Sequence, residues 1–314
     1  MKKTTLVFLL FTSSFNLFSQ EYIPKSSGEI IKHQYYTLSY NEKHEQANWV
    51  HYKINPDFLN GFAERRDKFR EDPIVSSKSA SLNDYKGSGY DRGHLVPAAD
   101  MKYNAIAMSE TFYMSNMSPQ KPGFNRGVWK RLESLVRAWG NRFEIYVSTA
   151  GVLSLNGSGF IGSNKVTIPS KYYKVIYAPE KKIMIAFLLS NAKQSGDLSS
   201  FVVSVDKIEA LTGIDFFSEL PDTIENDLES NISLKDWDFK VASSSGSVSE
   251  NSLKIISFQC KGFAKSSGNQ CRKKTTNSNK YCYLHQSQSN NYNPSKSKKS
   301  IYTGRCNANT KAGA

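Results

Sequence analysis

The distribution of cysteine along this 314-residue chain limits how most of it can fold. The four cysteines are Cys260, Cys271, Cys282 and Cys306, so the first 259 residues contain none. Because no disulfide can stabilise that large part, it must build a self-sufficient hydrophobic core. With 39% hydrophobic and 12% aromatic residues, the composition is sufficient for such a core.

The first twenty residues have the pattern of a cleaved signal peptide. Lys2 and Lys3 form a positively charged start, residues 6–11 (LVFLLF) form a short apolar run, and small and polar residues follow up to Gln20. This run is too short to span a bilayer, and no later stretch approaches the roughly 18 apolar residues of a membrane helix. We therefore expect residues 1–20 to be removed, leaving a secreted or periplasmic protein without stable membrane insertion.

The formal net charge of +13 favours an anionic partner. Nucleic acid, an acidic polysaccharide or a membrane surface each fits this charge, and charge alone does not choose among them. A basic secreted protein without such a partner fits the charge equally well.

Runs rich in β-branched and aromatic residues predict a set of strands, most of them paired as hairpins around polar connections: residues 35–40 with 48–54, residues 172–177 with 182–189, and residues 144–151. Residues 205–211 are predicted as a helix that ends at Gly213. Strands and helices alternate without a regular βαβ repeat. This mixture favours an α+β fold with a mainly antiparallel sheet.

The composition changes sharply after about residue 238. We expect one α+β domain over residues 21–238 and a Ser-rich linker over 239–254. A small Cys/His-rich module would follow over 255–287, and a disordered basic tail over 288–314.

A helix is predicted from about residue 125 onward. Its apolar residues fall on one narrow stripe that would face the core: Val128, Leu132, Leu135 and Trp139. Asn125, Glu133 and Arg137 follow a neighbouring face at multiples of four residues. A purely structural interpretation also fits, with Asn125 as the helix N-cap and Glu133 with Arg137 as an exposed ion pair.

Upstream of this helix, residues 91–94 place Asp, Arg, Gly and His in succession. Asp91 beside Arg92 suits a structural ion pair, Gly93 permits tight backbone geometry, and His94 is left as the titrating group. As an isolated tetrapeptide this is a modest signal, because a single histidine is more often structural than catalytic.

Three longer segments carry a much more specific signal: residues 90–100 (YDRGHLVPAAD), 111–121 (TFYMSNMSPQK) and 125–137 (NRGVWKRLESLVR). Together they resemble the DNA/RNA non-specific endonuclease family, which includes endonuclease G and secreted bacterial nucleases. That family has an Asp-Arg-Gly-His motif, an Asn-x-x-Pro-Gln segment, and an Asn opening a helix that bears a Glu. All three occur here in that order, within a resemblance that extends from about residue 35 to residue 229.

The resemblance implies a ββα-metal site, also called a His-Me finger. It implies that His94 is the general base that activates water and that Asn125 is the one direct protein ligand of Mg²⁺, with Mn²⁺ as the alternative ion. It further implies that Glu133 holds water around the ion. Asp91 would order the loop without reacting.

Arginines would contact the phosphate. The resemblance implies this role for Arg137 and for one arginine of residues 65–70, which we assign as Arg66. We include Arg92, from the Asp-Arg-Gly-His motif, among the catalytic residues. Because contacts to phosphate carry no base information, both DNA and RNA are expected as substrates, bound through the phosphate backbone.

The chemistry of these residue types agrees with the resemblance. An imidazole with a pKa of about 6.5 is a suitable base at neutral pH. Mg²⁺ keeps several waters and takes few protein ligands, so one asparagine suffices. Glu133 lies eight residues after Asn125, about 12 Å along a helix, so we expect it to act through water.

One residue departs from the family pattern. Many members have Gln or Asn after the metal-binding Asn, where this chain has Arg126. The added positive charge would either favour phosphate binding or displace the hydrated ion.

The C-terminal module contains Cys260, Cys271, Cys282 and His285 in the spacing C-x10-C-x10-C-x2-H. Three thiolates and one imidazole are a common ligand set for structural Zn²⁺. A disulfide with one remaining thiol is the alternative in an oxidising compartment. Residues 306–311 repeat part of the pattern of residues 260–265, so Cys306 is interpreted as the start of a shortened second copy.

The sequence therefore predicts a secreted, Mg²⁺-dependent nuclease. The main alternative is a secreted nucleic-acid-binding or surface-attachment protein with a degenerate nuclease fold, and a polysaccharide-active protein is supported only by the charge. The intact set of His94, Asn125 and Glu133 argues against degeneracy. The sequence leaves the oligomeric state open.

Overall fold

A computed structural model describes residues 22–58, 61, 63–154, 158–240, 258–263, 268–271, 274–275, 281 and 288. The chain divides into two compact units, residues 1–250 and 251–314, and the division falls within the predicted linker 239–254. The predicted signal peptide and Cys282, His285 and Cys306 lie outside the described residues.

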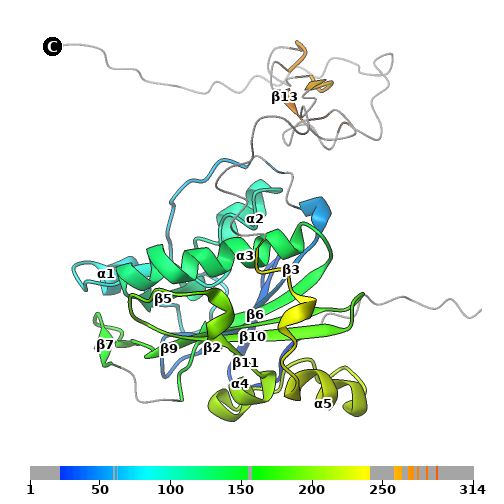
Figure 1. Cartoon of the computed structure of the whole chain (residues 1–314). Coiled ribbons are helices and arrows are strands. Elements are labelled where there is room, and N and C mark those ends of the chain that lie inside the picture. The colour runs from blue at the N-terminus through cyan, green and yellow to red at the C-terminus, as the bar shows by residue number, and fades with distance from the viewer. Residues whose placement is uncertain are drawn as a thin grey trace, which may run out of the picture. The chain divides into compact units, whose positions relative to one another are not determined.

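A seven-stranded sheet forms the centre of the larger unit (Figure 1). Its strands, in spatial order, are β1 (Glu29–Lys32), β2 (Thr37–Asn41), β3 (Gln46–Ile54), β6 (Ile145–Gly151), β9 (Lys171–Ala178), β10 (Ile183–Ser190) and β11 (Val202–Val203). Every neighbouring pair is antiparallel. Both predicted hairpins, the predicted strand near residue 147 and the predicted α+β class are confirmed.

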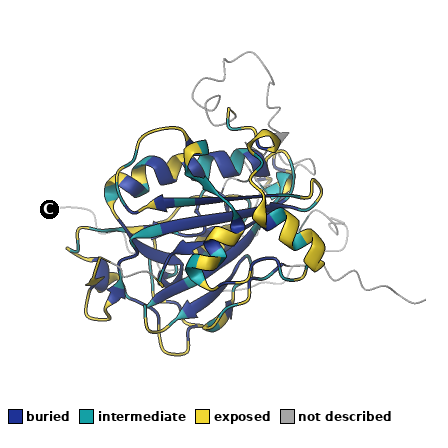
Figure 2. Ribbon diagram, turned by 60° about the horizontal axis from the view of Figure 1, so that its bottom comes forward, coloured by how far each residue is buried: buried dark blue, intermediate teal, exposed yellow. Residues whose placement is uncertain are grey.

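The central strands are buried on both faces, as the dark blue strands of Figure 2 show. All seven residues of β6 are buried, and so are all residues of β9 after Lys171. Strands covered on both faces are expected to be continuously apolar, and the sequences IYVSTAG and KYYKVIYA largely follow this rule. Lys174, in the middle of β9, is the exception, and it lies among the charged residues of the candidate site.

Helices cover the two faces of the sheet. The long helix α3 (Lys130–Gly140) lies on one face, and α4 (Val205–Thr212) and α5 (Asp222–Ser230) lie on the other (Figure 1). The predicted apolar stripe is confirmed, because Val128, Leu132, Leu135 and Trp139 are each at most 1% exposed. The predicted helix over 205–211 is also confirmed, and Gly213 ends it with a φ of +69°.

The helix predicted from residue 125 is not continuous. A π-helical turn, η3 (Phe124–Trp129), precedes α3, and Gly127 has non-helical angles of φ −104° and ψ −111°. Glycine has no Cβ, so it can adopt this geometry at low steric cost. The rise of about 12 Å expected for an unbroken helix between Asn125 and Glu133 therefore does not apply.

Shorter elements connect these layers: β4 (Asp91–His94), β5 (Met117–Gln120), β7 (Phe160–Ile161), β8 (Val166–Thr167), α1 (Leu82–Tyr85), α2 (Ala105–Glu110), and the 3₁₀ turns η1 (Pro56–Phe58), η2 (Met114–Asn116), η4 (Leu198–Phe201) and η5 (Leu234–Asp236). The smaller unit contains one described pair of strands, β12 (Phe258–Gln259) and β13 (Lys274–Thr275). Within the described parts of the chain, we find no helix with the length and apolar character needed to cross a membrane.

Candidate active site

The Asp-Arg-Gly-His motif forms strand β4, which pairs with β5 ahead of η3 and α3. The pairing is antiparallel, with Asp91 opposite Gln120 and His94 opposite Met117. Two strands followed by a helix make the expected ββα unit. Gly93 packs closely against the opposite strand, because a Cβ at that position would lie 2.2 Å from Cδ of the buried Gln120 side chain.

The loop between the strands is held by one buried asparagine. The Asn116 side chain accepts a hydrogen bond from the Val96 backbone N–H at 2.9 Å and donates to the Val96 carbonyl at 3.1 Å. It also donates to the Thr111 carbonyl at 2.9 Å. The Asn of the Asn-x-x-Pro-Gln segment therefore fixes the loop that follows His94.

His94 lies between two aromatic rings. Phe69 and Phe112 have ring centroids 5.7 and 5.1 Å from the imidazole. The Nε2 atom is buried and has no hydrogen-bonding partner among the described residues. Burial, assisted by the nearby charges of Arg65 and Arg92, lowers the pKa of His94 to about 3, although Asp67 opposes the shift. The imidazole is therefore neutral at physiological pH, as a proton acceptor must be.

Asp91 orients the first residues of the following helix. Its Oδ2 accepts a hydrogen bond from Nδ2 of Asn125 at 2.9 Å. Arg126 donates to both carboxylate oxygens of Asp91, at 2.9 Å from Nε and 2.6 Å from Nη2. Burial alone would raise the pKa of Asp91, but the hydrogen bonds from Arg126 and Asn125 outweigh it and lower the pKa. Asp91 thus holds Asn125 and Arg126, and its ion-pair partner is Arg126 instead of the adjacent Arg92.

Glu133 belongs to a group of four charged residues between α3 and the sheet. Arg137 donates from Nε to Oδ1 of Asp100 at 2.5 Å, so it does not form the exposed pair with Glu133 that was the structural alternative. Lys174 completes the group from β9 and is fully buried. Burial raises the pKa of Glu133, and the ammonium of Lys174 opposes that shift.

Two of the catalytic candidates lie within electrostatic range of the same arginine. Arg65 acts electrostatically on His94 and on Glu133, since its positive charge lowers the pKa of both. Neither the Glu133 carboxylate nor Oδ1 of Asn125 has a hydrogen-bonding partner among the described residues. The site thus presents a neutral base, an amide oxygen and a carboxylate, with arginines around them.

Comparisons with known proteins agree with this geometry. Residues 13–223 match the family described as DNA/RNA non-specific endonuclease. The chain belongs to this family. It is 36% identical to nuclease C1 of Cunninghamella echinulata var. echinulata over 65% of this chain and 89% of the relative. It is 32% identical to human mitochondrial endonuclease G over 60% of this chain and 69% of the relative.

A solved structure supports the same assignment. The crystal structure of an EndoG/EndoGI complex matches with a TM-score of 0.57 and 28% identity, covering 62% of this chain and 88% of that chain. The protein is therefore a nuclease that hydrolyses phosphodiester bonds of nucleic acids.

The arginines of the nuclease differ in position. Both adjacent arginines pair with surface acids, Arg65 with Asp67 at 2.7 Å and Arg66 with Glu64 at 3.2 Å, but only Arg65 acts on the pKa of His94. Arg65 lies over the Phe112 ring at 5.3 Å, and Arg92 lies over the Phe69 ring at 4.3 Å. The structure thus brings Arg65 and Arg92 beside His94 and places the predicted Arg66 outside this group.

The residues fit a hydrated divalent ion. The Nδ2 atom of Asn125 is committed to Asp91, which leaves its Oδ1 as a hard oxygen ligand. Arg126, whose charge was one reason to expect displacement of the ion, is neutralised by Asp91. The departure from the family pattern is therefore compatible with metal binding.

Lys174, Asp100 and Arg65 were not predicted as site residues. A lysine inside the otherwise apolar run of β9 was visible in the sequence and signals a buried partner of opposite charge. No comparable signal marks Asp100, because its pairing with Arg137 depends on tertiary packing. Arg65 and Arg66 are adjacent, and only the structure distinguishes their directions.

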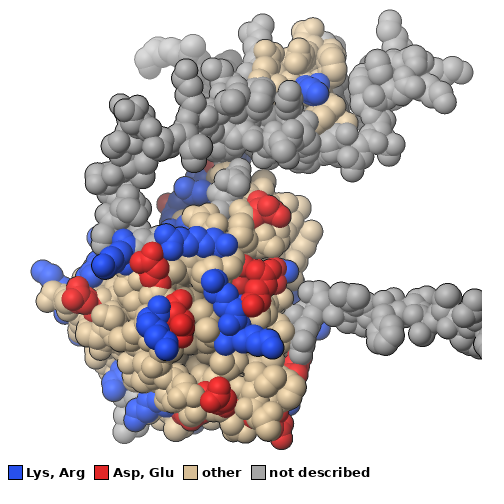
Figure 3. All heavy atoms as spheres, turned by 45° about the vertical axis from the view of Figure 1, so that its right-hand side comes forward, with Lys and Arg blue, Asp and Glu red and all other residues tan. Residues whose placement is uncertain are grey.

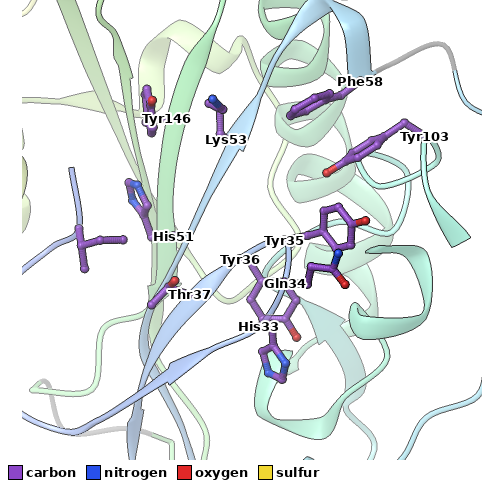
Figure 4. A pocket seen from close by; sticks show the side chains of 11 residues that line it. His33, Gln34, Tyr35, Tyr36, Thr37, His51, Lys53, Phe58, Tyr103 and Tyr146 are labelled. Atoms are coloured by element: carbon purple, nitrogen blue, oxygen red, sulfur yellow. The ribbon is translucent and has the colours of Figure 1, made fainter. Parts of the chain in front are cut away.

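A separate pocket of about 340 Å³ lies elsewhere on the nuclease (Figure 4). His51 and Tyr146 line it from the sheet, and Tyr35, Phe58 and Tyr103 line it from the other side. None of the predicted catalytic residues contributes to its walls. Its size alone therefore does not make it the catalytic site.

In the smaller unit, the two described cysteines are buried in one cluster. The Gly262 backbone N–H donates to Sγ of Cys260 at 3.3 Å, and the Cys271 N–H donates to the Gly262 carbonyl at 2.7 Å. The other two predicted ligands, Cys282 and His285, lie outside the described residues, so the zinc set stays a prediction.

Proposed function

We propose that this nuclease is a secreted, Mg²⁺-dependent endonuclease that cuts DNA and RNA with little regard to sequence. The observation that carries the proposal is the neutral His94 imidazole, whose buried Nε2 has no partner in the described structure. A general base needs such an available nitrogen next to the water that attacks. Secretion rests on the signal-peptide pattern of residues 1–20.

In this proposal, Nε2 of His94 accepts a proton from water as that water attacks phosphorus and the bond to the leaving oxygen breaks. Mg²⁺ held through Oδ1 of Asn125 would neutralise negative charge on the phosphate. Glu133 positions water around the ion through its unpaired carboxylate.

Arginines complete the proposed site. Arg65 takes the phosphate-binding role that the sequence suggested for Arg66, and Arg92 stands on the other side of His94. Arg137 retains a partly exposed side chain while bound to Asp100, so it can orient that network and contact phosphate. Since all these groups contact the phosphate backbone of the nucleic acid, base identity has little influence on cleavage.

The test is the substitution His94→Ala. We expect the rate of plasmid nicking with Mg²⁺ to fall by about 10²–10⁴-fold, the usual contribution of a general base, while DNA binding stays unchanged. EDTA should abolish nicking by the unsubstituted nuclease, and an RNA substrate should respond in the same way. Nicking at the unsubstituted rate by the His94→Ala variant would refute the mechanism.

We also propose that Cys260, Cys271, Cys282 and His285 bind one structural Zn²⁺. The burial of Cys260 and Cys271 in a common cluster supports this set over two unrelated thiols. Metal analysis of the purified full chain should find one zinc per chain, lost in a Cys271→Ser variant. An absence of zinc together with a disulfide at Cys271 would favour the alternative.

A further inference from the structure

The helices α4 and α5 carry a cluster of carboxylates on the face of the sheet opposite α3 (Figure 1). Asp206 and Glu209 lie one turn apart on α4, and Glu229 lies near the end of α5. One oxygen from each of these three side chains lies within 4.8 Å of the others. None of these residues belongs to the catalytic group.

Glu229 distinguishes this cluster from an ordinary acidic surface. Its residue is only 4% exposed, and its Oε1 is buried without a hydrogen-bonding partner among the described residues. A buried carboxylate oxygen without a partner is costly and calls for a bound water or ion. Glu209, by contrast, accepts a hydrogen bond from the Phe216 backbone N–H at 2.8 Å, which fixes its position beside Glu229.

The surroundings of the cluster add negative charge. Asp215 and Glu225 lie close enough to act on Glu229. Lys25 pairs with Asp215 at 3.9 Å, but no salt bridge within the described residues reaches Asp206, Glu209 or Glu229. Without a cation, burial and the neighbouring carboxylates raise the pKa of Glu229 to about 9, so the alternative state is a protonated Glu229.

We propose that Asp206, Glu209 and Glu229 bind one Ca²⁺ ion, which joins α4 to α5. Carboxylate oxygens alone select a hard cation over zinc or copper. Ca²⁺ binds oxygens at about 2.3–2.6 Å, so opposite ligands on one ion lie up to about 5 Å apart, which matches the observed spacing. Mg²⁺ demands a smaller octahedral shell and retains its water, which makes it the weaker competitor.

The experiment titrates Ca²⁺ into the metal-stripped full chain by calorimetry, in excess Mg²⁺ to occupy the catalytic site. We expect one Ca²⁺ per chain with a Kd on the order of 10⁻⁴ M. Saturating Ca²⁺ should raise Tm by roughly 5 °C, because the ion binds only the folded state. Nuclease activity in Mg²⁺ should not change.

Two variants remove the site and one leaves it intact. Glu229→Gln and Asp206→Asn should abolish Ca²⁺ binding and the rise in Tm, and Asp206 is exposed, so its substitution does not threaten folding. Asp227→Asn, an exposed acid on the same helix α5, should bind Ca²⁺ as the unsubstituted chain does. If the unsubstituted chain shows no Ca²⁺ binding in excess Mg²⁺, or if all three variants behave alike, the proposal is overturned and Glu229 is protonated.

Discussion

The nuclease domain and the C-terminal part of the chain carry very different charge. Residues 21–238 contain 26 Lys and Arg against 27 Asp and Glu, whereas residues 239–314 contain 13 Lys and Arg against a single acid. On the face shown in Figure 3, Lys and Arg side chains are interspersed with Asp and Glu. The charge of +13, which suggested an anionic partner for the chain as a whole, therefore does not describe the catalytic domain.

This difference in charge suggests different roles for the two regions: catalysis in the domain and attraction of polyanions in the C-terminal part. A nearly neutral domain must attract phosphate through a few specific basic side chains. Two of them, Arg65 and Arg92, lie over the Phe112 and Phe69 rings next to His94. We expect the basic segment of 76 residues to attract polyanions through counterion release without contributing to chemistry. Substitutions inside the domain should thus change turnover, and changes in the C-terminal part should change affinity.

The largest effect is expected from the one buried lysine described in the domain. Lys174→Met leaves Asp100 and Glu133 facing each other with only Arg137 to compensate them, and breaking a buried charge group commonly costs about 3–5 kcal/mol. That cost lowers the free energy of unfolding, and kcat at neutral pH should fall as well, by roughly tenfold or more, because more Glu133 is then protonated. Because Lys174 lowers the pKa of Glu133, its loss should raise that pKa and move the acidic limb of the rate profile to higher pH.

A matched control separates this role from simple destabilisation. Lys171→Met removes a lysine from the same strand, outside the charged group, and should leave both kcat and the pH profile unchanged. A Lys174→Met variant that loses thermal stability but keeps the pH profile would show that the lysine is only structural.

The next effect concerns the basic segment. A chain ending at residue 240 keeps the packing of Trp237 and Phe239 on Trp139 and removes nearly all of the surplus charge. We expect KM for DNA to rise at least about tenfold near physiological salt, with kcat unchanged. The dependence of KM on salt should also become shallower, by about 0.9 in the logarithmic slope for each phosphate that the segment no longer neutralises.

The effect of the basic charge can be distinguished from the effect of the Cys/His-rich module in the full chain. Replacing Lys296, Lys298 and Lys299 by Gln should produce part of the same shift in the salt dependence while leaving the Cys/His-rich module intact. If truncation changes kcat but not the salt slope, the separation of tasks between the two regions is wrong.

The sequence predicted those parts of the fold that depend on local pattern. The hairpins of β2 with β3 and β9 with β10, the stripe from Val128 to Trp139 and the end of α4 at Gly213 all follow from periodicity and turn chemistry. What it missed is one local break in a helix and several contacts between distant segments. Gly127 breaks the predicted helix, Asp91 pairs with Arg126 35 residues away, and Lys174 interacts with Glu133 and Asp100 from distant parts of the chain.

The smallest expected effect tests the choice between two adjacent arginines. Arg65 adds to the effect of burial by lowering the pKa of His94 through like-charge repulsion, so Arg65→Gln should move the titration of His94 from about pH 3 to higher pH. An NMR titration of His94 in the free nuclease measures this shift without relying on turnover. Arg66→Gln should leave the titration unchanged, because Arg66 is not among the charges that act on His94. Equal shifts of the His94 pKa in both variants would mean that either arginine can lie next to His94. Both arginines, and not Arg65 alone, would then be assigned to phosphate binding.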